Sequence, residues 1–322
     1  MGPASRLPPD EPDPSGGPAA APPTGAERAP ERFVVAATSW SLAEWSVAVR
    51  SAAGHVKGDR LTVAAGAFAY RWFLAIFPVV IALLGVASLV RMPAHVVASL
   101  VNGVDKALPS GAAAVVQRAV LRASSGKATL SATVVAGVIG LWSGTSGMVM
   151  LEEGLDMAFE LPQDRSFLRK RLVALPLLAA ATLLGGGASA LVVFGPQLGH
   201  LIAHHAPVAG PVFRWAWTVV RFVVALVLMV VLLSVVYHVA PNRRQPTWRI
   251  GSAGAVVATV LWGATSLGFS LYTTSFGSYA DTYGAFAGVA ILSFWLFLTG
   301  LAVLVGGELD AAFERQRADV DR

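Results

Sequence analysis

A long apolar segment near the carboxyl end constrains this chain more than any other feature. Residues 284–307 carry no charged side chain, and Glu308 and Asp310 follow on the same helical pattern. About 20 apolar residues, each adding 1.5 Å to a helix, match the hydrocarbon thickness of a bilayer. A core helix of a soluble protein is not apolar on every face for this length. The segment therefore predicts a membrane-spanning helix that ends in two carboxylates.

The composition agrees with a membrane protein. Hydrophobic residues make up 55% of the 322 residues and charged residues 13%, with a mean hydropathy of +0.63. Ordinary soluble domains carry about a quarter charged residues. The absence of cysteine excludes disulfides, thiolate metal sites and cysteine nucleophiles. The phosphate-binding pattern G-x-x-x-x-G-K-[ST] is also absent, and we expect no cofactor.

Five further apolar segments are long enough to cross a bilayer, which gives six predicted spans. They cover about residues 64–90, 130–151, 172–195, 216–239, 251–275 and 284–307. Before the first span, residues 31–60 are more polar and predict an amphipathic helix that lies in the membrane interface. The predicted fold is all-α, with a six-span membrane domain over residues 61–315 and this interfacial N-terminal helix.

Three remaining segments complete the predicted organisation. Residues 1–30, rich in Pro, Ala and Gly, cannot bury enough apolar surface to fold and are expected to be disordered, without a cleavable signal peptide. Residues 92–127 predict a helical hairpin on the outer face. Residues 316–322 predict a cytoplasmic tail.

Lys and Arg residues determine the predicted orientation. Sixteen of them lie in the first sixty residues, in the loops after spans two and four, and in the tail, against seven on the opposite side. Cytoplasmic loops of membrane proteins are enriched in these residues. Both termini are therefore predicted to be cytoplasmic.

Two span ends carry a related sequence. Span two ends in GLDMAFE at 154–160, and span six ends in ELDAAFE at 308–314. A tryptophan precedes the shared aspartate by fourteen residues in span two (Trp142) and by fifteen in span six (Trp295). The pattern suggests that spans one–two and five–six are duplicated hairpins running in the same direction, although such echoes also arise by chance in an Ala/Gly-rich chain.

Short motifs follow one another along the spans. They are Ala69-Tyr70 with Phe77-Pro78, Leu141-Trp142-Ser143, Tyr237 with Pro241-Asn242-Arg243-Arg244, Tyr272, Tyr283-Gly284, and Gly306-Gly307-Glu308-Leu309-Asp310. Together they resemble the YihY / virulence factor BrkB family of bacterial inner-membrane proteins over about residues 45–315. The resemblance implies a six-span protein of the bacterial plasma membrane and supplies no settled biochemical activity. We expect structural roles for these positions: Pro78, Trp142, Tyr237, Pro241, Tyr283, Gly284, Trp295, Gly306 and Gly307.

The family has also been described as ribonuclease BN, and the residues do not favour that activity. A metal-dependent nuclease needs clustered carboxylates or histidines to hold metal ions against a phosphodiester. No H-x-H-x-D-H run occurs, and the charged residues are dispersed among the spans. His200, His204 and His205 could ligate a metal, but they have no nearby carboxylate and are more typical of a surface cluster. We predict no catalytic residue, no metal site and no nucleic-acid partner.

Carboxylates at the span ends are the first candidate functional residues. Glu152 and Asp156 are four residues apart and so share one face of span two. Glu308 lies at the matching depth of span six, and Asp310 is turned away from it. These carboxylates could form an acidic vestibule for a substrate or ion pathway, or could simply mark where water begins.

Arg71, one or two turns inside span one, is the second candidate. A charge inside a membrane is costly and usually faces a partner or a wet cavity, although a side chain near the surface can also snorkel to water. With Tyr70 and the carboxylates, Arg71 predicts a transporter or lipid-handling protein for an anionic or amphipathic small molecule or lipid. The alternative is a non-transporting envelope-assembly or scaffold protein. The lipid bilayer is the expected partner in both cases, and a homo-oligomer is compatible with either.

Overall fold

The computed structural model describes residues 42–58, 61–89, 130–162, 165–205, 211–243, 250–274 and 285–320. The chain divides into two units, Met1–Arg32 and Phe33–Arg322, and all described residues belong to the second. The predicted tail 1–30, the predicted hairpin 92–127 and the motif residues Tyr283 and Gly284 lie outside the described residues.

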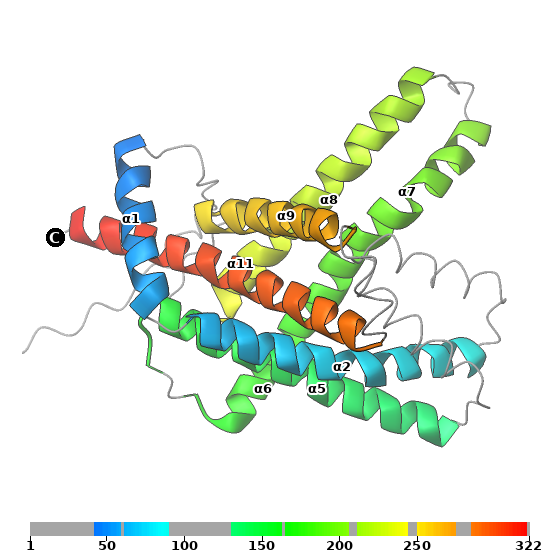
Figure 1. The fold of residues 1–322 in the computed structure, drawn as a ribbon, viewed down its shortest axis with the longest axis horizontal. Helices are drawn as coiled ribbons and strands as arrows, with labels where there is room; N and C mark the ends of the chain where they lie inside the picture. Colours follow the sequence, from blue (N-terminus) through cyan, green and yellow to red (C-terminus); the bar gives the residue numbers. More distant parts are fainter. Residues whose placement is uncertain are drawn as a thin grey trace, which may run out of the picture. The chain divides into compact units, whose positions relative to one another are not determined.

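All regular structure within these ranges is helical, which confirms the all-α prediction (Figure 1). The helices are α1 (Leu42–Gly58), α2 (Leu61–Leu89), α5 (Leu130–Ala158), α6 (Phe167–Ala180), the π-helical η1 (Ala181–Gly185), α7 (Gly186–His205), α8 (Pro211–Val239), α9 (Ala253–Thr274) and α11 (Ala285–Val320).

Six of the described helices are long and apolar enough to cross a membrane, as predicted. The candidate spans are Leu61–Ala82, Leu130–Ala158, Phe167–Gly199, Val212–Val239, Ala253–Tyr272 and Phe286–Arg317. The third is one continuous rod in which α6, η1 and α7 follow without a break. Three helices continue well past the predicted span ends: α5 to Ala158, α7 to His205 and α11 to Val320, so residues 316–320 extend α11.

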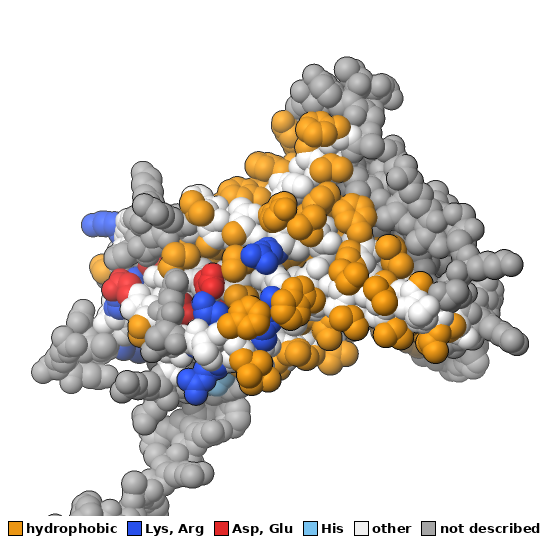
Figure 2. Space-filling model, turned by 90° about the horizontal axis from the view of Figure 1, so that it is seen from below, with side chains coloured by type: hydrophobic (Ala, Val, Ile, Leu, Met, Phe, Trp, Pro, Cys, Tyr) orange, Lys and Arg blue, Asp and Glu red, His pale blue; other side chains and the backbone are white. Residues whose placement is uncertain are grey.

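The bundle exposes apolar side chains as lipid-facing helices do. On α8, Val220 and Val223 are about half exposed, and on α5 Val138 is 63% exposed. Figure 2 shows hydrophobic side chains over much of the described surface on one face, with acidic and most basic side chains toward one end. Helices can span lipid in this way because their backbone groups are satisfied internally.

Glycines on α5 allow close packing against its neighbours. Gly140, Gly147 and Gly154 recur every seven residues along one side of the helix, the spacing of a left-handed helix pair. A Cβ added at these positions would lie 3.1, 2.6 and 2.7 Å from the nearest neighbouring atom. Those neighbours are Val79 and Trp72 of α2 and Leu304 of α11, respectively. Small residues thus set the distances between α5, α2 and α11.

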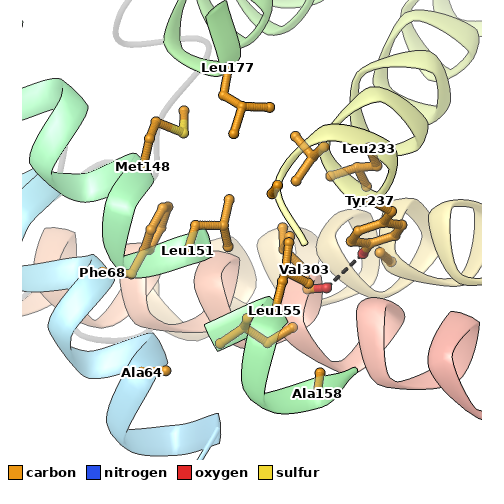
Figure 3. Packing of buried hydrophobic residues seen from close by; sticks show 14 of the residues in the cluster. Ala64, Phe68, Met148, Leu151, Leu155, Ala158, Leu177, Leu233, Tyr237 and Val303 are labelled. Atoms are coloured by element: carbon orange, nitrogen blue, oxygen red, sulfur yellow. Dashed lines mark hydrogen bonds between the residues drawn. The ribbon is translucent and has the colours of Figure 1, made fainter. Parts of the chain in front are cut away.

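A buried cluster joins α2, α5, α6, α8 and α11 (Figure 3). Its members include Phe68, Met148, Leu151, Leu155, Leu177, Leu233, Tyr237 and Val303. The Tyr237 hydroxyl donates to the Val303 carbonyl at 2.6 Å, which adds a polar contact between α8 and α11. The helix ends that carry the charged residues are therefore held by a common core.

Helix α1 covers most of the predicted interfacial segment 31–60 and packs on the distal part of α11. Ala48 and Ala52 of α1 lie in a cluster with Leu309 and Phe313. Trp45 meets the Phe313 ring edge to face, at 5.1 Å between centroids. Small residues on α1 therefore face protein, and the position of α1 in a membrane interface stays a prediction.

Candidate functional site

Most of the predicted pathway carboxylates are buried, in the last two turns of α5 and within α11, which continues to Val320. Glu152, Asp156 and Glu308 are 1%, 2% and 0% exposed, and Asp310 is partly buried. We call these four residues the carboxylate junction. A buried charge is tolerated only when partners replace its lost water, so the contacts of each carboxylate decide its role.

Arg165, two residues before α6, binds the α5 side of the junction. Its Nη1 lies 3.3 Å from Glu152 Oε2 and also donates to the Ala240 carbonyl at 2.6 Å. Its Nη2 donates to the carbonyl of the motif residue Pro241 at 3.2 Å. One guanidinium thus joins the end of α5 to the segment that follows α8.

Asn242 completes this connection. Its backbone N–H donates to Asp156 Oδ1 at 2.7 Å, and its side-chain oxygen accepts from Arg165 Nε at 3.1 Å. Its amide nitrogen donates to the Pro162 carbonyl at 3.3 Å. The Pro241-Asn242 step is therefore a structural connector between α8 and α5.

Arg315 binds the α11 side of the junction. Its Nη2 lies 2.6 Å from Glu308 Oε1, and its Nη1 lies 3.2 Å from Glu160 Oε1. Nη1 also donates to the Ala158 carbonyl at 3.3 Å. Because Ala158 is the last residue of α5 and Glu160 follows it by two residues, this arginine connects the end of α5 to α11.

Arg243 makes a third connection beside the junction. Its Nη1 lies 2.5 Å from Glu314 Oε1, and its Nη2 donates to the Tyr237 carbonyl. Its guanidinium carbon lies 4.4 Å from the centre of the Phe159 ring. These contacts join the segment after α8 to both α11 and the end of α5.

Asp310 accepts a hydrogen bond from the Gly254 N–H at 2.7 Å, at the start of α9. Helices α9 and α11 touch here, because a Cβ on Gly254 would lie 2.1 Å from the Gly306 carbonyl oxygen. A Cβ on Gly306 would lie 2.5 Å from the Tyr237 hydroxyl, and one on Gly307 would lie 2.3 Å from α5. The Gly-Gly step is therefore a packing requirement of the junction.

The two related span ends use their shared aspartates alike. Asp156 and Asp310 each accept one backbone N–H at 2.7 Å, from the segment after α8 and from the start of α9, respectively. Glu160 and Glu314, the last residues of the two motifs, each pair with an arginine. The matching contacts of the two motifs agree with a duplicated hairpin. The common origin of spans one–two and five–six stays a prediction.

The other motif residues have separate roles. Trp142 is 57% exposed, whereas Trp295 is partly buried and its Nε1 donates to Ser266 at 3.2 Å. Pro78 lies inside α2, next to the point where Gly140 approaches the α2 backbone. The two tryptophans therefore do not occupy equivalent environments.

A cavity of about 310 Å³ lies between α2, α5 and the beginning of α6. We call it the basic cavity. Its lining residues are Arg71, Ser146, Val149, Met150, Glu153, Arg165, Phe167, Lys170 and Arg171. Four cations and one carboxylate line it, so the cavity favours an anion.

Arg171 forms a fixed wall of the basic cavity. Its Nη1 donates to Thr145 Oγ1 at 2.6 Å and to the Trp142 carbonyl at 3.0 Å, and its Nη2 donates to Ser146 Oγ at 2.8 Å. The guanidinium also lies over the Trp142 ring at 4.2 Å and near the Phe167 ring at 5.4 Å. Its geometry is therefore held before any ligand arrives.

The structure divides the six predicted pathway residues. Arg71 lines the basic cavity, but Tyr70, which is 63% exposed, does not. The carboxylate that faces this cavity is Glu153 and not its neighbour Glu152. No junction carboxylate lines the basic cavity, and Arg165, which lines it and pairs with Glu152, is the residue that the two regions share.

Asp310 faces a second, much smaller cavity of about 30 Å³. The other lining residues are Ser234, Tyr237, His238, Arg243, Ser252 and Glu314. This volume has room for about one or two waters with polar partners. It is too small for an amphiphile.

In the sequence, Arg165, Lys170 and Arg315 contribute only to the predicted orientation. The structure makes Arg165 and Arg315 the partners of buried glutamates, and Lys170 lines the basic cavity. One signal was available: Arg315 follows Glu308 by seven residues, two turns of one helix, which places both on the same face. No such sequence signal identified the partners of Arg165, because they depend on how the turn before α6 places this residue against the end of α5.

No group of three His, Asp or Glu side chains within the described ranges is placed to hold a metal ion. The side chains of His200, His204 and His205 lie outside the description, so their predicted surface role stays a prediction.

Comparison with known proteins finds relatives in several bacteria. The chain is 31% identical to the putative ribonuclease-like protein YfkH of Bacillus subtilis over 180 residues, which are 56% of this chain and 65% of the relative. It is 43% identical over 90 residues to a UPF0761 membrane protein of Alteromonas mediterranea, covering 27% of this chain and 30% of the relative. A UPF0761 membrane protein of Vibrio cholerae is 41% identical over 76 residues, which are 24% of this chain and 25% of the relative. The chain thus aligns with less than two thirds of each of these proteins.

No solved structure matches the chain. The family model described as virulence factor BrkB matches residues 52–322, which include all six candidate spans. This multi-pass membrane protein therefore belongs to the virulence factor BrkB family.

Proposed function

We propose that this chain is a transport or lipid-handling protein of the bacterial inner membrane that takes an anionic amphiphile at the basic cavity. The observation that carries the proposal is a cavity of about 310 Å³ lined by four cations and one carboxylate, between three helices with apolar exposed surfaces. Arg71, Lys170 and Arg171 lie within candidate spans, where charge is usually kept for a substrate pathway or a partner.

A lipid-movement assay in liposomes tests the proposal. The full chain is reconstituted with a fluorescent anionic lipid, and transfer between leaflets is followed for the wild type, Arg71→Gln and Arg169→Gln. Arg169 is a matched control because it is exposed and does not line the cavity. We expect Arg71→Gln to lower the rate about tenfold, the effect of losing one charged hydrogen bond. Equal rates in the two variants would remove the cavity from the function.

We propose cytoplasmic termini, from the sixteen-to-seven distribution of Lys and Arg. The absence of cysteine makes this simple to test. In whole cells, an impermeant maleimide should label Val212→Cys, which lies at the start of α8, and should label Gln316→Cys only after lysis. The reverse labelling would invert the topology.

A scaffold function is the second candidate, and the carboxylate junction favours it. The four carboxylates bind arginines or backbone N–H groups and connect helix ends, as a purely structural cluster would. Crosslinking in cells tests this alternative: stable, stoichiometric partners without lipid movement would favour scaffolding.

We further propose that the chain acts without enzymatic chemistry. "Ribonuclease-like" in the name of the Bacillus subtilis relative describes that protein. The dispersed charges of this sequence argue against a two-metal nuclease. Ribonuclease activity of the purified full chain, lost on chelation of metal, would contradict this proposal.

A further inference from the structure

We infer that the basic cavity binds the phosphate of an anionic phospholipid headgroup, with Arg71 and Arg171 as its two principal contacts. This inference rests on the proposed function and deepens it by naming the substrate class. It depends on charge balance, on the directions of the donors and on the surface around the cavity.

Charge balance leaves two cations for a ligand. Lys170 and Arg165 are each paired with a glutamate, at 2.6 and 3.3 Å. Arg171 donates only to neutral hydroxyl and carbonyl groups, and Arg71 forms no ion pair or hydrogen bond with any described residue. Two adjacent cations without a carboxylate repel each other, and an anion between them removes that cost.

The cationic donors converge from two helices. Arg71 comes from α2, and Lys170 and Arg171 come from the first five residues of α6. Ser146 of α5 already donates to the Trp142 carbonyl and helps to hold Arg171. A phosphate offers several acceptor oxygens in a tetrahedral arrangement and binds guanidinium groups through paired hydrogen bonds. A carboxylate offers two oxygens in one plane and satisfies fewer of these directions. No side chain caps the first turn of α6 at Ser166, and the positive end of this helix also favours an anion.

The surface around the cavity favours a lipid over free phosphate. Phe167 and Trp142, whose ring centres are 6.1 Å apart, are 66% and 57% exposed beside it. Exposed aromatic residues of this kind are typical of the headgroup level of a membrane. One turn along α2 from Arg71, Leu74 is 44% exposed, and one turn along α6 from Arg171, Leu175 is 47% exposed. A headgroup in the cavity would place its acyl chains along these apolar side chains.

Equilibrium binding to the purified full chain in a neutral detergent tests the inference. The probes are dioctanoyl phosphatidylglycerol, octanoate and inorganic phosphate, titrated by calorimetry into the wild type, Arg71→Gln and Arg169→Gln. We expect the phospholipid to bind at least about tenfold more tightly than either comparator. Arg71→Gln should weaken it about tenfold, and Arg169→Gln by no more than about twofold.

Three outcomes would overturn the inference. If octanoate binds as tightly as the phospholipid, the cavity recognises any anionic amphiphile and does not select the phosphate group. If inorganic phosphate binds as tightly as the phospholipid, the ligand of the cavity is a free anion and not a lipid. Equal affinities of Arg71→Gln and Arg169→Gln would move the site away from this cavity.

The binding and lipid-movement assays separate the two proposals. If phospholipid binding ignores Arg71 while lipid movement depends on it, the phosphate inference fails and the proposed function stands. If binding depends on Arg71 in a protein that moves no lipid, the headgroup site stands and transport fails.

Discussion

Two adjacent residues of α5 belong to regions of opposite character. The Glu152 side chain is 1% exposed and lies in the carboxylate junction against Arg165. The Glu153 side chain is 29% exposed and lies on the basic cavity, paired with Lys170. Junction carboxylates bind fixed partners within packed helix ends, whereas the cavity keeps about 310 Å³ open and an excess of cations. On our proposal, charge at the end of a span serves packing where it is buried and ligand binding where it lines the cavity.

The junction should respond to mutation as structure. It joins α5, α8, α9 and α11 through arginines and backbone N–H groups. The cavity should respond as a binding site, because Arg71 makes no ion pair or hydrogen bond with a described residue. Measurements of unfolding and of lipid binding on variants of each region therefore distinguish the two.

Arg165→Ala should have the largest effect on stability. It leaves Glu152 as an uncompensated buried charge and removes the donor of the Ala240 and Pro241 carbonyls. We expect the free energy of unfolding, measured in mixed micelles, to fall by about 3–5 kcal/mol. Arg169→Ala, on the exposed side of the same segment, should stay within about 0.5 kcal/mol of the wild type. Similar losses in both variants would mean that the ion pair contributes nothing.

Gly254→Ala tests the contact between α9 and α11. The added methyl group would lie 2.1 Å from the Gly306 carbonyl oxygen, so the helices must separate. We expect the free energy of unfolding to fall by about 1–3 kcal/mol in the same assay. Gly263→Ala is the matched control on α9, since its methyl group would meet no atom within 4 Å. A neutral Gly254→Ala would show that the helices do not pack this closely.

Tyr237→Phe should have a smaller effect. It removes the hydrogen bond to the Val303 carbonyl but keeps the buried ring. A loss of about 0.5–1.5 kcal/mol is expected for one neutral hydrogen bond. The thermal unfolding midpoint in detergent measures it, and an unchanged midpoint would show that this bond adds nothing to the contact between α8 and α11.

Arg71→Gln should have the smallest effect on stability. The side chain is exposed and makes no ion pair with a described residue, so a change within about 0.5 kcal/mol is expected. Measured by the same unfolding assay, a loss as large as that of Arg165→Ala would place Arg71 in the structure and abolish the contrast between the two regions.

The architecture could be predicted because lipid imposes simple rules on sequence. A continuous apolar segment predicts a helix, and six such segments predict the six spans found. The Gly-Gly step before Glu308 and the shared aspartates marked positions that do make close helix contacts. Length and small residues are local signals, and the sequence displays them directly.

The division between junction and cavity could not be predicted in the same way. A span that is apolar on all sides does not reveal which face meets protein, so Glu152 and Glu153 could not be distinguished. Arg165 reaches Glu152 only because the chain turns back between α5 and α6. Arg71 was expected to face a partner or a wet cavity together with the carboxylates; it lines a cavity with Lys170 and Arg171, and the predicted pathway carboxylates do not line that cavity.

Lipid movement per folded molecule, measured for Arg71→Gln and Glu308→Gln in parallel, tests the central claim most directly. The folded fraction of each reconstituted variant is determined, and the transfer rate of a fluorescent anionic phospholipid is divided by it. We expect Arg71→Gln to fold like the wild type and to transfer lipid about tenfold more slowly, whereas Glu308→Gln should be less stable but should transfer normally once folded. Normal transfer in Arg71→Gln, or lost transfer in fully folded Glu308→Gln, would contradict it.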